Sequence, residues 1–383
     1  LHSLESSVAP DWFHRKMQQV LRLRCRPAAA LFACFLVQCV HCAYVQPPAL
    51  PMPRFASACV RGSACMEADP ASPCVIKVLG VGGGGGNAVN RMIQYGQAQS
   101  SAVEYWAINT DIQALDASLS PNRLGLGAGT SRGLGAGGNP DMGMAAADES
   151  FEQISQMVAG SDMVFVVAGM GGGTGSGAAP IVAECAQSAG ALTVGVVTKP
   201  FSFEGMRRTR QADSAVAKLA QHVDAMIVVS NDRLLDLVEE GTPLQEAFCV
   251  ADDILRQGVV GISDIIIKPG LINVDFADVQ SVMGTSGLAL MGIGTADGKS
   301  RARDAAIAAV SSPLIDFPIS QATGIVFTIT GSSDMTLQEV NAAAEAIYEM
   351  ADPDANIIFG AQIDDSMGNV LSITVVATGF GTK

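Results

Sequence analysis

Residues 165–177 read FVVAGMGGGTGSG, and this stretch decides the fold class. The apolar run 163–168 predicts a strand that is buried on both faces, as in a parallel sheet. It stops at six glycines in nine residues, with Thr174 and Ser176 among them, and 178–189 then predicts a helix. Glycine lets backbone N–H groups approach an oxyanion, hydroxyls add donors, and a helix N-terminus adds partial positive charge. The order therefore predicts an anion site; an ordinary tight turn, the alternative, needs only one or two glycines.

Length and composition allow two domains with substantial cores. The chain has 383 residues, of which 49% are hydrophobic and only 16% are charged. These proportions are typical of a buried parallel sheet rather than of a disordered chain. The formal net charge of −14 does not favour a nucleic-acid surface.

Residues 1–74 differ in composition from residues 75–383. They hold seven of the nine cysteines, and seven Lys/Arg against four Asp/Glu, whereas the body has a net charge of −17. The body has no CxxC pair and no Cys/His cluster, so we expect neither a thiol metal site nor a disulfide framework there, which fits a reducing compartment. We assign no metal-ligating residues.

The first 74 residues resemble a targeting leader. A basic region precedes the apolar run 28–40, whose 13 residues are too few for a comfortable transmembrane helix and suit a signal-peptide core. Residues 44–74 are rich in Pro, Ala, Ser and Arg and resemble a plastid transit peptide. This order resembles the bipartite leader of algae with secondary plastids and predicts the plastid stroma. A mitochondrion, a bacterial cytoplasm or an extension without targeting role are the alternatives.

Strands and helices alternate from residue 75 to residue 230, and ligand-type residues follow the strands. This alternation predicts a doubly wound α/β domain whose site lies at the carboxyl ends of the strands. The expected strands are 75–80, 103–108, 163–168, 192–197 and 225–230.

Two further glycine-rich segments leave alternatives open. Gly80, Gly82 and Gly85 satisfy the GxGxxG spacing and Asp111 follows the second strand, so a nicotinamide oxidoreductase is one interpretation. Residues 121–140 contain seven glycines and are either a flexible linker or backbone that closes over a ligand.

A long helix and an acidic segment follow. Thr242-Pro243 predicts a helix start, and this helix is expected to run to Gly261. A strand-like run follows at 264–268. Upstream, before the strand at 163–168, residues 141–159 predict another helix. Asp275 and Asp278, behind Asn273, suit water activation or metal ligation, although one of them can be a helix N-cap.

The segment from residue 284 to the end predicts a second α/β domain without an active site of its own, because no glycine-rich anion loop recurs in it. We expect helices at 298–311 and 336–350. The expected strands are 288–293, 325–330, 355–361 and 370–377.

Seven motifs resemble those of FtsZ and occur in the order that FtsZ has. They are GVGGGGGNAV at 80–89, NTD at 109–111, RGLGAGGNP at 132–140, GGGTGSG at 171–177, TKPF at 198–201, FEG with RR at 203–208, and NVDFADV at 273–279. The likeness covers about residues 75–380, so the chain is identified as a member of the tubulin/FtsZ superfamily.

The resemblance implies an α/β, tubulin/FtsZ-like fold in four parts. After the leader (1–74) come a Rossmann-type GTP-binding domain (75–241), a long central helix with a catalytic loop (242–283), and a smaller α/β C-terminal domain (284–383). It also implies a GTPase that uses GTP/GDP and Mg²⁺ and assembles head to tail into filaments and lateral bundles. The leader adds the expectation of a plastid division ring, with membrane-tethering division proteins as partners and with neither nucleic acid nor a membrane span.

The resemblance also assigns site residues. The residues implied to bind nucleotide are Gly82, Gly83, Gly84, Gly85, Gly86, Asn87, Gly135, Ala136, Gly137, Gly138, Gly172, Gly173, Thr174, Gly175, Ser176, Glu204, Arg208, Phe248 and Asp253. Phe248 would stack on guanine, and Asp253 would accept hydrogen bonds from its N1–H and N2–H, because a carboxylate offers two acceptors. Asn273, Asp275 and Asp278 would act on the GTP of the next subunit, so hydrolysis would require assembly.

Two departures from the family pattern matter. Asp252 stands where many bacterial members have Asn, and this resembles cyanobacterial and plastid relatives. The sequence stops at Lys383 without the linker and tail motif that bind membrane adaptors, so either the protein lacks them or the sequence ends before them. A non-hydrolysing structural filament subunit is a further alternative, against which the retention of Asp275 and Asp278 speaks.

Overall fold

The structure describes most of residues 75–383. The computed structural model describes residues 74–95, 103–234, 243–267, 270–272, 274–284, 286–312, 315 and 317–380. The leader, apart from Cys74, and the candidate residue Asn273 lie outside the described residues, so the expectations for them stay predictions. In the described part of the chain, no helix combines the length and the apolar character needed to cross a membrane.

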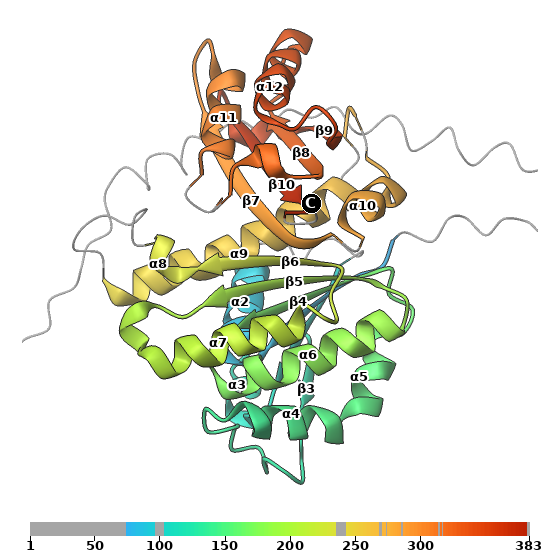
Figure 1. The fold of residues 1–383 in the computed structure, drawn as a ribbon, viewed down its shortest axis with the longest axis vertical. Helices are drawn as coiled ribbons and strands as arrows, with labels where there is room; N and C mark the ends of the chain where they lie inside the picture. The colour runs from blue at the N-terminus through green and yellow to red at the C-terminus, as the bar shows by residue number, and fades with distance from the viewer. Residues whose placement is uncertain are drawn as a thin grey trace, which may run out of the picture. The chain divides into compact units, whose positions relative to one another are not determined.

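The N-terminal half is built on a parallel sheet, as expected (Figure 1). Its described strands are β1 (Ile76–Val81), β2 (Val103–Asn109), β3 (Asn122–Gly125), β4 (Met163–Gly169), β5 (Leu192–Lys199) and β6 (Ala225–Ser230). Its described helices are α2 (Gly82–Gln94), α3 (Ile112–Asp116), α4 (Pro140–Glu149), α5 (Phe151–Val158), α6 (Gly173–Ser188), α7 (Met206–Leu219), α8 (Asn231–Leu234) and the short η2 (Ser202–Glu204). Because all six strands are parallel, their carboxyl ends share one edge of the sheet.

Strand β4 illustrates why these segments are apolar throughout. Successive side chains of a strand point to opposite faces. Met163 and Phe165 belong to the core that α2 covers, whereas Val164 and Val166 belong to the core beneath α5, α6 and α7. Both faces are thus buried, and a polar residue on either face would lose its water.

The C-terminal half continues the same sheet. Its described elements are α9 (Leu244–Ile267), α10 (Phe276–Met283), β7 (Gly287–Ala296), α11 (Arg301–Val310), η3 (Ile319–Gln321), β8 (Gly324–Gly331), α12 (Leu337–Met350), β9 (Asn356–Ile363), η4 (Asp365–Met367) and β10 (Leu371–Thr378). A short parallel pairing of β6 with β7 gives one sheet of ten described strands in the order β3-β2-β1-β4-β5-β6-β7-β10-β8-β9.

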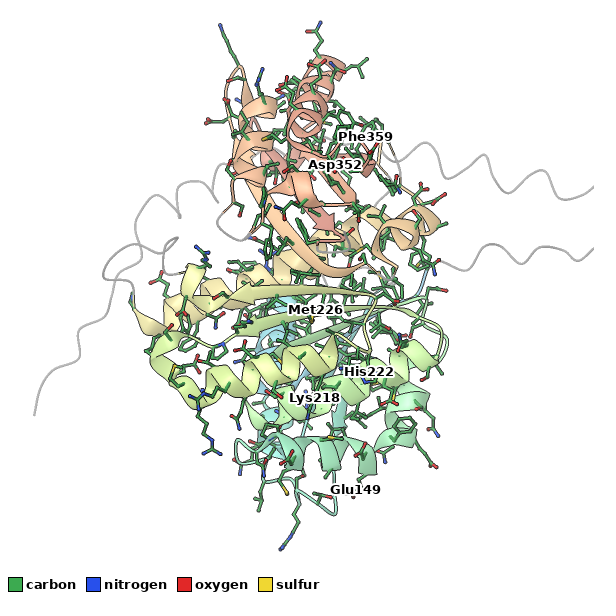
Figure 2. The ribbon with its side chains drawn as sticks, in the orientation of Figure 1. Glu149, Lys218, His222, Met226, Asp352 and Phe359 are labelled. Atoms are coloured by element: carbon green, nitrogen blue, oxygen red, sulfur yellow. The ribbon has the colours of Figure 1, made fainter. Side chains whose placement is uncertain are left out.

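Side chains fill the space between this sheet and its helices (Figure 2). Helices α11 and α12 cover one face of β8 and β10, where Phe327 and Ile373 are buried. Val326 and Val376 point to the other face and join the core that contains α9 and α10. The long helix α9 therefore packs against strands of both halves.

Helix α9 is longer than the sequence indicated. The strand expected at 264–268 is wrong, because the helix continues to Ile267. Val259, Ile262 and Ile265 are all buried and recur at helical spacing. The β-branched run Ile265–Ile267 resembles a strand locally. It is helical because its side chains continue the face of α9 that packs against the sheet.

The helix expected at 141–159 is two helices. Helix α4 ends at Glu149 and α5 begins at Phe151. Between them Ser150 leaves the helical geometry, and its hydroxyl accepts a hydrogen bond from Gly127 N–H at 3.0 Å. This long-range hydrogen bond ties the break between the two helices to the segment after β3.

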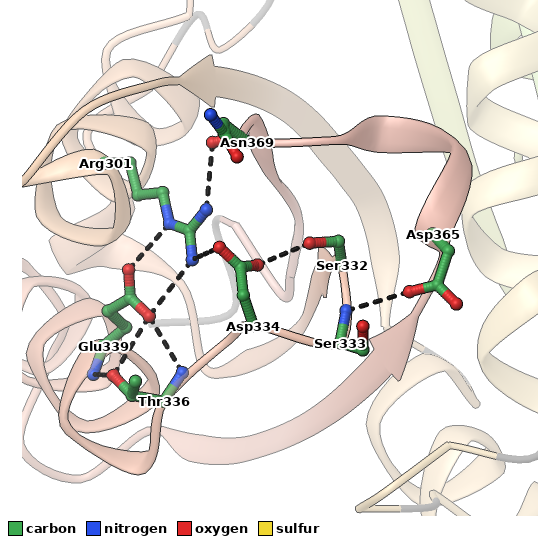
Figure 3. Close-up of polar contacts among 8 residues, drawn as sticks. All are labelled: Arg301, Ser332, Ser333, Asp334, Thr336, Glu339, Asp365 and Asn369. Carbon is green, nitrogen blue, oxygen red and sulfur yellow. Dashed lines mark hydrogen bonds and ion pairs between the residues drawn. The ribbon is translucent and has the colours of Figure 1, made fainter.

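A buried arginine ties the C-terminal half together (Figure 3). Arg301, at the start of α11, is only 6% exposed. Its guanidinium donates to Glu339 at 2.7 Å and to the Asn369 carbonyl at 3.0 Å, and it pairs with Asp334 at 3.2 Å. The hydrogen bond from Arg301 holds the pKa of Glu339 below its usual value. This network joins α11, the β8–α12 loop and the turn before β10.

Candidate active site

A cavity of about 370 Å³ lies where the carboxyl ends of β4 and β5 meet the N-termini of α2 and α6. This is the edge at which ligands bind in open α/β sheets. Its lining comprises Gly83, Gly84, Asn87, Gly169, Met170, Gly172, Gly173, Thr174, Gly175, Thr198, Pro200, Glu204, Arg208, Asn231, Phe248, Ala251 and Asp252. A larger cavity of about 620 Å³ lies between α9 and the C-terminal strands, and none of the described glycine-rich loops lines it.

Two helix N-termini supply donors to the smaller cavity. Helix α2 begins at Gly82 and α6 at Gly173, earlier than the sequence indicated, so parts of the glycine segments are first helical turns. Neither N-cap residue, Val81 or Gly172, closes its helix with a side-chain hydrogen bond. The first N–H groups are therefore available to an anion, and the two helix dipoles reinforce them.

Positive backbone φ angles explain the glycines at two positions beside the loops. Gly82 has φ +75°, and a Cβ there would lie 2.9 Å from Gly175 N. Gly171 has φ +93°, and a Cβ there would lie 3.0 Å from the Arg208 carbonyl. Any other residue would strain the backbone and push the two loops apart.

The two predicted hydroxyls have different surroundings. Thr174 lines the cavity, and its Oγ1 is 2.7 Å from Thr110 Oγ1. Ser176 is 2% exposed and does not line this cavity; its Oγ accepts a hydrogen bond from Gly171 N–H at 2.8 Å. Ser176 therefore shapes the loop from behind, while Thr174 is placed to meet the ligand.

The predicted loop Gly135–Gly138 borders the cavity without being part of its lining. It lies against α6, because a Cβ on Gly173 would be 2.8 Å from Ala136 Cβ and 3.0 Å from Asn139 N. Gly137 and Gly138 have positive φ and open space around them. The loop thus lies against residues that line the cavity, and its assignment to the outer end of a phosphate chain stays a prediction.

The other predicted glycines at the start of α2 divide into two groups. Gly83 and Gly84 line the cavity, together with Asn87. Gly85 does not: a Cβ there would lie 2.2 Å from the Val167 carbonyl, so it allows α2 to pack closely on β4. Gly86 does not line the cavity either, and a Cβ there would meet no atom within 4 Å.

The dinucleotide interpretation loses its support in the same region. Gly80 and Gly85 serve helix–strand packing, since a Cβ on Gly80 would lie 2.6 Å from the Gly85 carbonyl. Asp111 is the N-cap of α3 and accepts a hydrogen bond from Gln113 N–H at 2.9 Å. Its carboxylate therefore has a structural partner and is not among the residues that line the cavity.

An acid–base pair lies on another wall. Glu204, from η2, and Arg208, from α7, line the cavity and form an ion pair one helical turn apart. The Glu204 carboxylate also accepts a hydrogen bond from Phe201 N–H at 3.0 Å, which orients it. The pair can offer both an acceptor for hydroxyl groups and a cation for phosphate.

The N-terminal part of α9 forms the remaining wall. Phe248 is 40% exposed and lines the cavity, with its ring edge-on to Phe201 at 5.4 Å between centroids. Asp252 follows four residues later and lines the same wall. An exposed ring beside a carboxylate provides a stacking surface and two acceptors for a planar base.

Asp253, the carboxylate expected to read the base, is placed elsewhere. It does not line the cavity and pairs with Arg256 at 3.2 Å. The reason is helical geometry: residues four apart share a face, whereas Asp253 is five residues after Phe248. The structure therefore corrects the sequence assignment from Asp253 to Asp252.

The surroundings of Asp252 alter its titration. Burial raises the pKa of its carboxyl to about 6; Arg91, 3.9 Å away, opposes this shift, and the neighbouring Asp253 adds to it. A carboxylate that is desolvated beside a cavity costs free energy until donors reach it. Two N–H donors of a ligand base would meet that requirement.

Asn231 is a further residue that the sequence did not point out. It follows β6, lines the cavity and is 7% exposed, and its Oδ1 has no hydrogen-bond partner among the described residues. The sequence feature that could have identified Asn231 is its position directly after a parallel strand, where ligand-binding residues lie in open α/β sheets. For Asp252 the signal was its spacing of four residues from Phe248 on one helix face.

The predicted catalytic acids lie outside the cavity. Asp275 is the N-cap of α10, and its carboxylate accepts a hydrogen bond from Asp278 N–H at 2.7 Å. Asp278, in the first turn of α10, is exposed. Helix α10 packs on β8, and Thr378 Oγ1 donates to the Val282 carbonyl at 3.1 Å, which holds the acids at the C-terminal half.

Comparison with known proteins agrees with this geometry. Residues 75–239 match the model of the tubulin/FtsZ family GTPase domain, and residues 287–381 match that of the FtsZ family C-terminal domain. An empty FtsZ dimer from M. jannaschii has 43% sequence identity and a TM-score of 0.76, over 80% of this chain and 89% of the other. The chain belongs to the FtsZ family. It is therefore a GTPase that binds GTP and GDP, self-associates, and has the filament-forming cell-division function of FtsZ.

More distant FtsZ-like structures share the fold. CetZ1 from Haloferax volcanii, as a GDP-bound monomer, has 18% identity and a TM-score of 0.70, over 80% of this chain and 95% of the other. CetZ2 from the same organism, as a GTPγS-bound protofilament, has 22% identity and a TM-score of 0.66, over 79% of this chain and 92% of the other. FtsZ-family membership also excludes the nicotinamide oxidoreductase interpretation.

Proposed function

We propose that this chain is the GTPase subunit of a plastid division filament, in which each hydrolytic site is completed by the next subunit. The observation that carries the proposal is the separation of two halves of one chemistry. The cavity has phosphate donors and a base-binding wall, while the exposed acids Asp275 and Asp278 lie on α10 beyond the far end of α9.

The length of α9 makes this separation large. Phe248 lies near its first residue and Ile267 is its last. Nineteen residues of helix correspond to about 29 Å. Because α10 is held against β8, its acids belong to the C-terminal half and not to the cavity lining of their own chain. A head-to-tail neighbour brings one end of a subunit against the other end of the next, which unites the halves.

The two acids are suited to different roles at such an interface. The Asp275 carboxylate is engaged as the helix cap, so it orients the first turn of α10. The Asp278 carboxylate makes no hydrogen bond or ion pair with any other residue in the described part of the chain. It is therefore available to orient and polarise a water molecule for attack on the γ-phosphate of the neighbour.

Mg²⁺ belongs to the proposal. Within the described residues, no three His, Cys, Asp or Glu side chains are close enough to hold a metal ion. The cavity nevertheless suits a nucleotide-borne ion, because Mg²⁺ at nucleotide sites keeps several waters and relies on phosphate oxygens. The chain would contribute the loops that orient those oxygens, and the ion would offset charge on the β- and γ-phosphates.

The substitution Asp278→Ala tests the shared site. The variant keeps the cavity intact, so we expect GTP affinity within about twofold of the parent and a fall in turnover of at least about 100-fold, in the range attributed to a general base. Affinity is measured by equilibrium titration and turnover by phosphate release. Asp365→Ala is the control, because Asp365 is an exposed carboxylate of η4 outside the cavity and outside α10. Parent-like turnover of Asp278→Ala would contradict the proposal.

The plastid location rests on the leader. Its order, an apolar signal-like core followed by a transit-like segment, supports entry into a plastid with more than two bounding membranes, with a mitochondrion as the alternative. Membrane-tethering division proteins are the partners that this location implies.

Residues 1–74 fused to a fluorescent reporter test the location. In an alga with secondary plastids we expect the reporter in the plastid stroma, and a fusion lacking residues 28–40 should remain in the cytosol because the apolar core is gone. Mitochondrial or unchanged cytosolic fluorescence of the full leader would contradict the plastid assignment without affecting the GTPase.

A further inference from the structure

A second cavity, of about 200 Å³, lies behind the phosphate loops between α4, α6 and α7. Pro140 and Met144 come from α4, and Pro180 and Ile181 come from α6; they give the cavity an apolar body. Its volume suits a compact molecule of about ten non-hydrogen atoms, smaller than a typical drug-sized ligand. None of these residues takes part in the nucleotide cavity.

The charged residues of the lining favour a cation. Asp141 and Glu184 both line the cavity, and neither forms an ion pair with a cation in the described ranges. Lys218 also lines it, but its exposed side chain can extend into solvent. Figure 2 shows Lys218 and His222 at the end of α7, the one wall that carries basic or imidazole groups.

Helix α6 carries a proline on its wall of the cavity. Pro180 lies inside the helix and has no N–H, so the Ser176 carbonyl lacks the hydrogen bond that residue i+4 normally donates. Both residues line the cavity, and Ser176 is 2% exposed. A ligand with N–H donors would find the two carboxylates, Asp141 and Glu184, at this cavity.

We propose that the cavity between α4, α6 and α7 is a second ligand site, that it binds a small aromatic cation with N–H donors, of the arylamidine class, and that it is coupled to the nucleotide site. The binding part of the proposal is independent of the shared hydrolytic site. The coupling part rests on nucleotide binding by the loops of α2 and α6.

The coupling follows from the close packing of α4 on α6. A Cβ on Gly177 would lie 2.1 Å from the Pro140 carbonyl, and a Cβ on Gly143 would lie 2.4 Å from the Gly173 carbonyl. The two backbones touch, so α4 cannot move away from a ligand without changing its contact with the phosphate loop. Ser176 reinforces the link, because it lines this cavity while its Oγ holds Gly171 N–H.

Benzamidine is a suitable probe, with benzamide and benzoate as its neutral and anionic counterparts. Ligand-detected NMR titration of the full chain should show benzamidine binding at least fivefold more tightly than benzamide, with no saturable binding of benzoate. Glu184→Gln should reduce this preference at least threefold, because it removes one carboxylate. Equal affinity for benzamidine and benzoate would overturn the proposal.

A matched pair of methionines locates the site. Met144 and Met142 lie on α4 with similar exposure, 41% and 37%, but only Met144 lines the cavity. Met144→Trp should fill the cavity and weaken benzamidine at least tenfold, whereas Met142→Trp should leave its affinity unchanged. Gln221→Trp, at the exposed rim, gives a second blocking variant if Met144→Trp fails to fold. Parent-like binding in whichever blocking variants fold would overturn the site.

Reciprocal titration tests the coupling. Saturating GDP should change the benzamidine dissociation constant at least twofold, and saturating benzamidine should change that of GDP by the same factor, since linkage is reciprocal. Complete displacement of benzamidine by GDP would mean that the probe occupies the nucleotide cavity, and would overturn the proposal. Binding of benzamidine without any mutual effect would refute the coupling and leave the GTPase assignment untouched.

Discussion

Asp252 reaches the nucleotide cavity because it lies about one helical turn after Phe248, whereas Asp253 is rotated by about 100° around α9. The ring of Phe248 and the carboxylate of Asp252 thus form one wall, and Asp253 pairs with Arg256 instead. At the scale of single residues, base selectivity is expected to depend on Asp252 alone. Guanine presents two N–H donors to a carboxylate, and adenine does not.

Exchanging this carboxylate for an amide should change the preferred base. Asp252→Asn replaces one acceptor by a donor, so GTP affinity should fall about 10- to 100-fold, as expected for losing a hydrogen bond to a charged group. Xanthosine triphosphate, whose C2 carries a carbonyl, should bind the variant more tightly than GTP. Equilibrium titration with both nucleotides measures the change.

Asp253→Asn is the matched control, because it is adjacent, chemically identical and directed away from the cavity. It should retain the GTP preference of the parent. A xanthosine preference in Asp253→Asn, or none in Asp252→Asn, would contradict the assignment of Asp252.

At the scale of elements, the glycines at the start of α2 have separate tasks. Gly85 permits contact with β4, since a Cβ there would lie 2.2 Å from the Val167 carbonyl, whereas Gly86 faces open space. Gly85→Ala should therefore destabilise the fold by about 1–3 kcal/mol or more through overpacking. Gly86→Ala should be neutral or stabilise by up to about 1 kcal/mol, because Ala has the higher helix propensity. Urea unfolding midpoints compare the two, and equal midpoints would contradict this division.

Elements also show what the sequence could and could not predict. The buried parallel strands followed from apolar runs such as Val164–Ala168, because burial on both faces leaves a local pattern. The helical state of Asp264–Ile267 did not follow, because it depends on packing of α9 against strands far along the chain. The assignment of the base-reading acid missed by one residue, although spacing on the helix face contained the answer. The unpartnered Oδ1 of Asn231 became visible only in the folded structure.

At the scale of the whole molecule, α9 runs between the nucleotide cavity and the segment that carries the acids of α10. With 24 residues it is about 36 Å long, the nucleotide cavity is near its N-terminus, and α10 follows its C-terminal end. If the hydrolytic site is shared as proposed, a subunit by itself has a complete binding site and an incomplete hydrolytic one. We then expect every internal interface of a head-to-tail filament to be complete, so that turnover depends on assembly.

Mixing two variants with complementary defects tests this central claim most directly. Asp278→Ala keeps the cavity and lacks an acid, whereas Arg208→Ala weakens the cavity and keeps the acids of α10. In a random one-to-one filament, about a quarter of the interfaces would pair an intact cavity with intact acids. We predict that phosphate release by the mixture clearly exceeds the average of the two variants measured alone. As a control, the double variant Asp278→Ala/Arg208→Ala mixed with Asp278→Ala should stay inactive, because no subunit then supplies the Asp278 carboxylate. A mixture that only reproduces that average, although both variants enter the same filaments, would contradict a hydrolytic site shared between subunits.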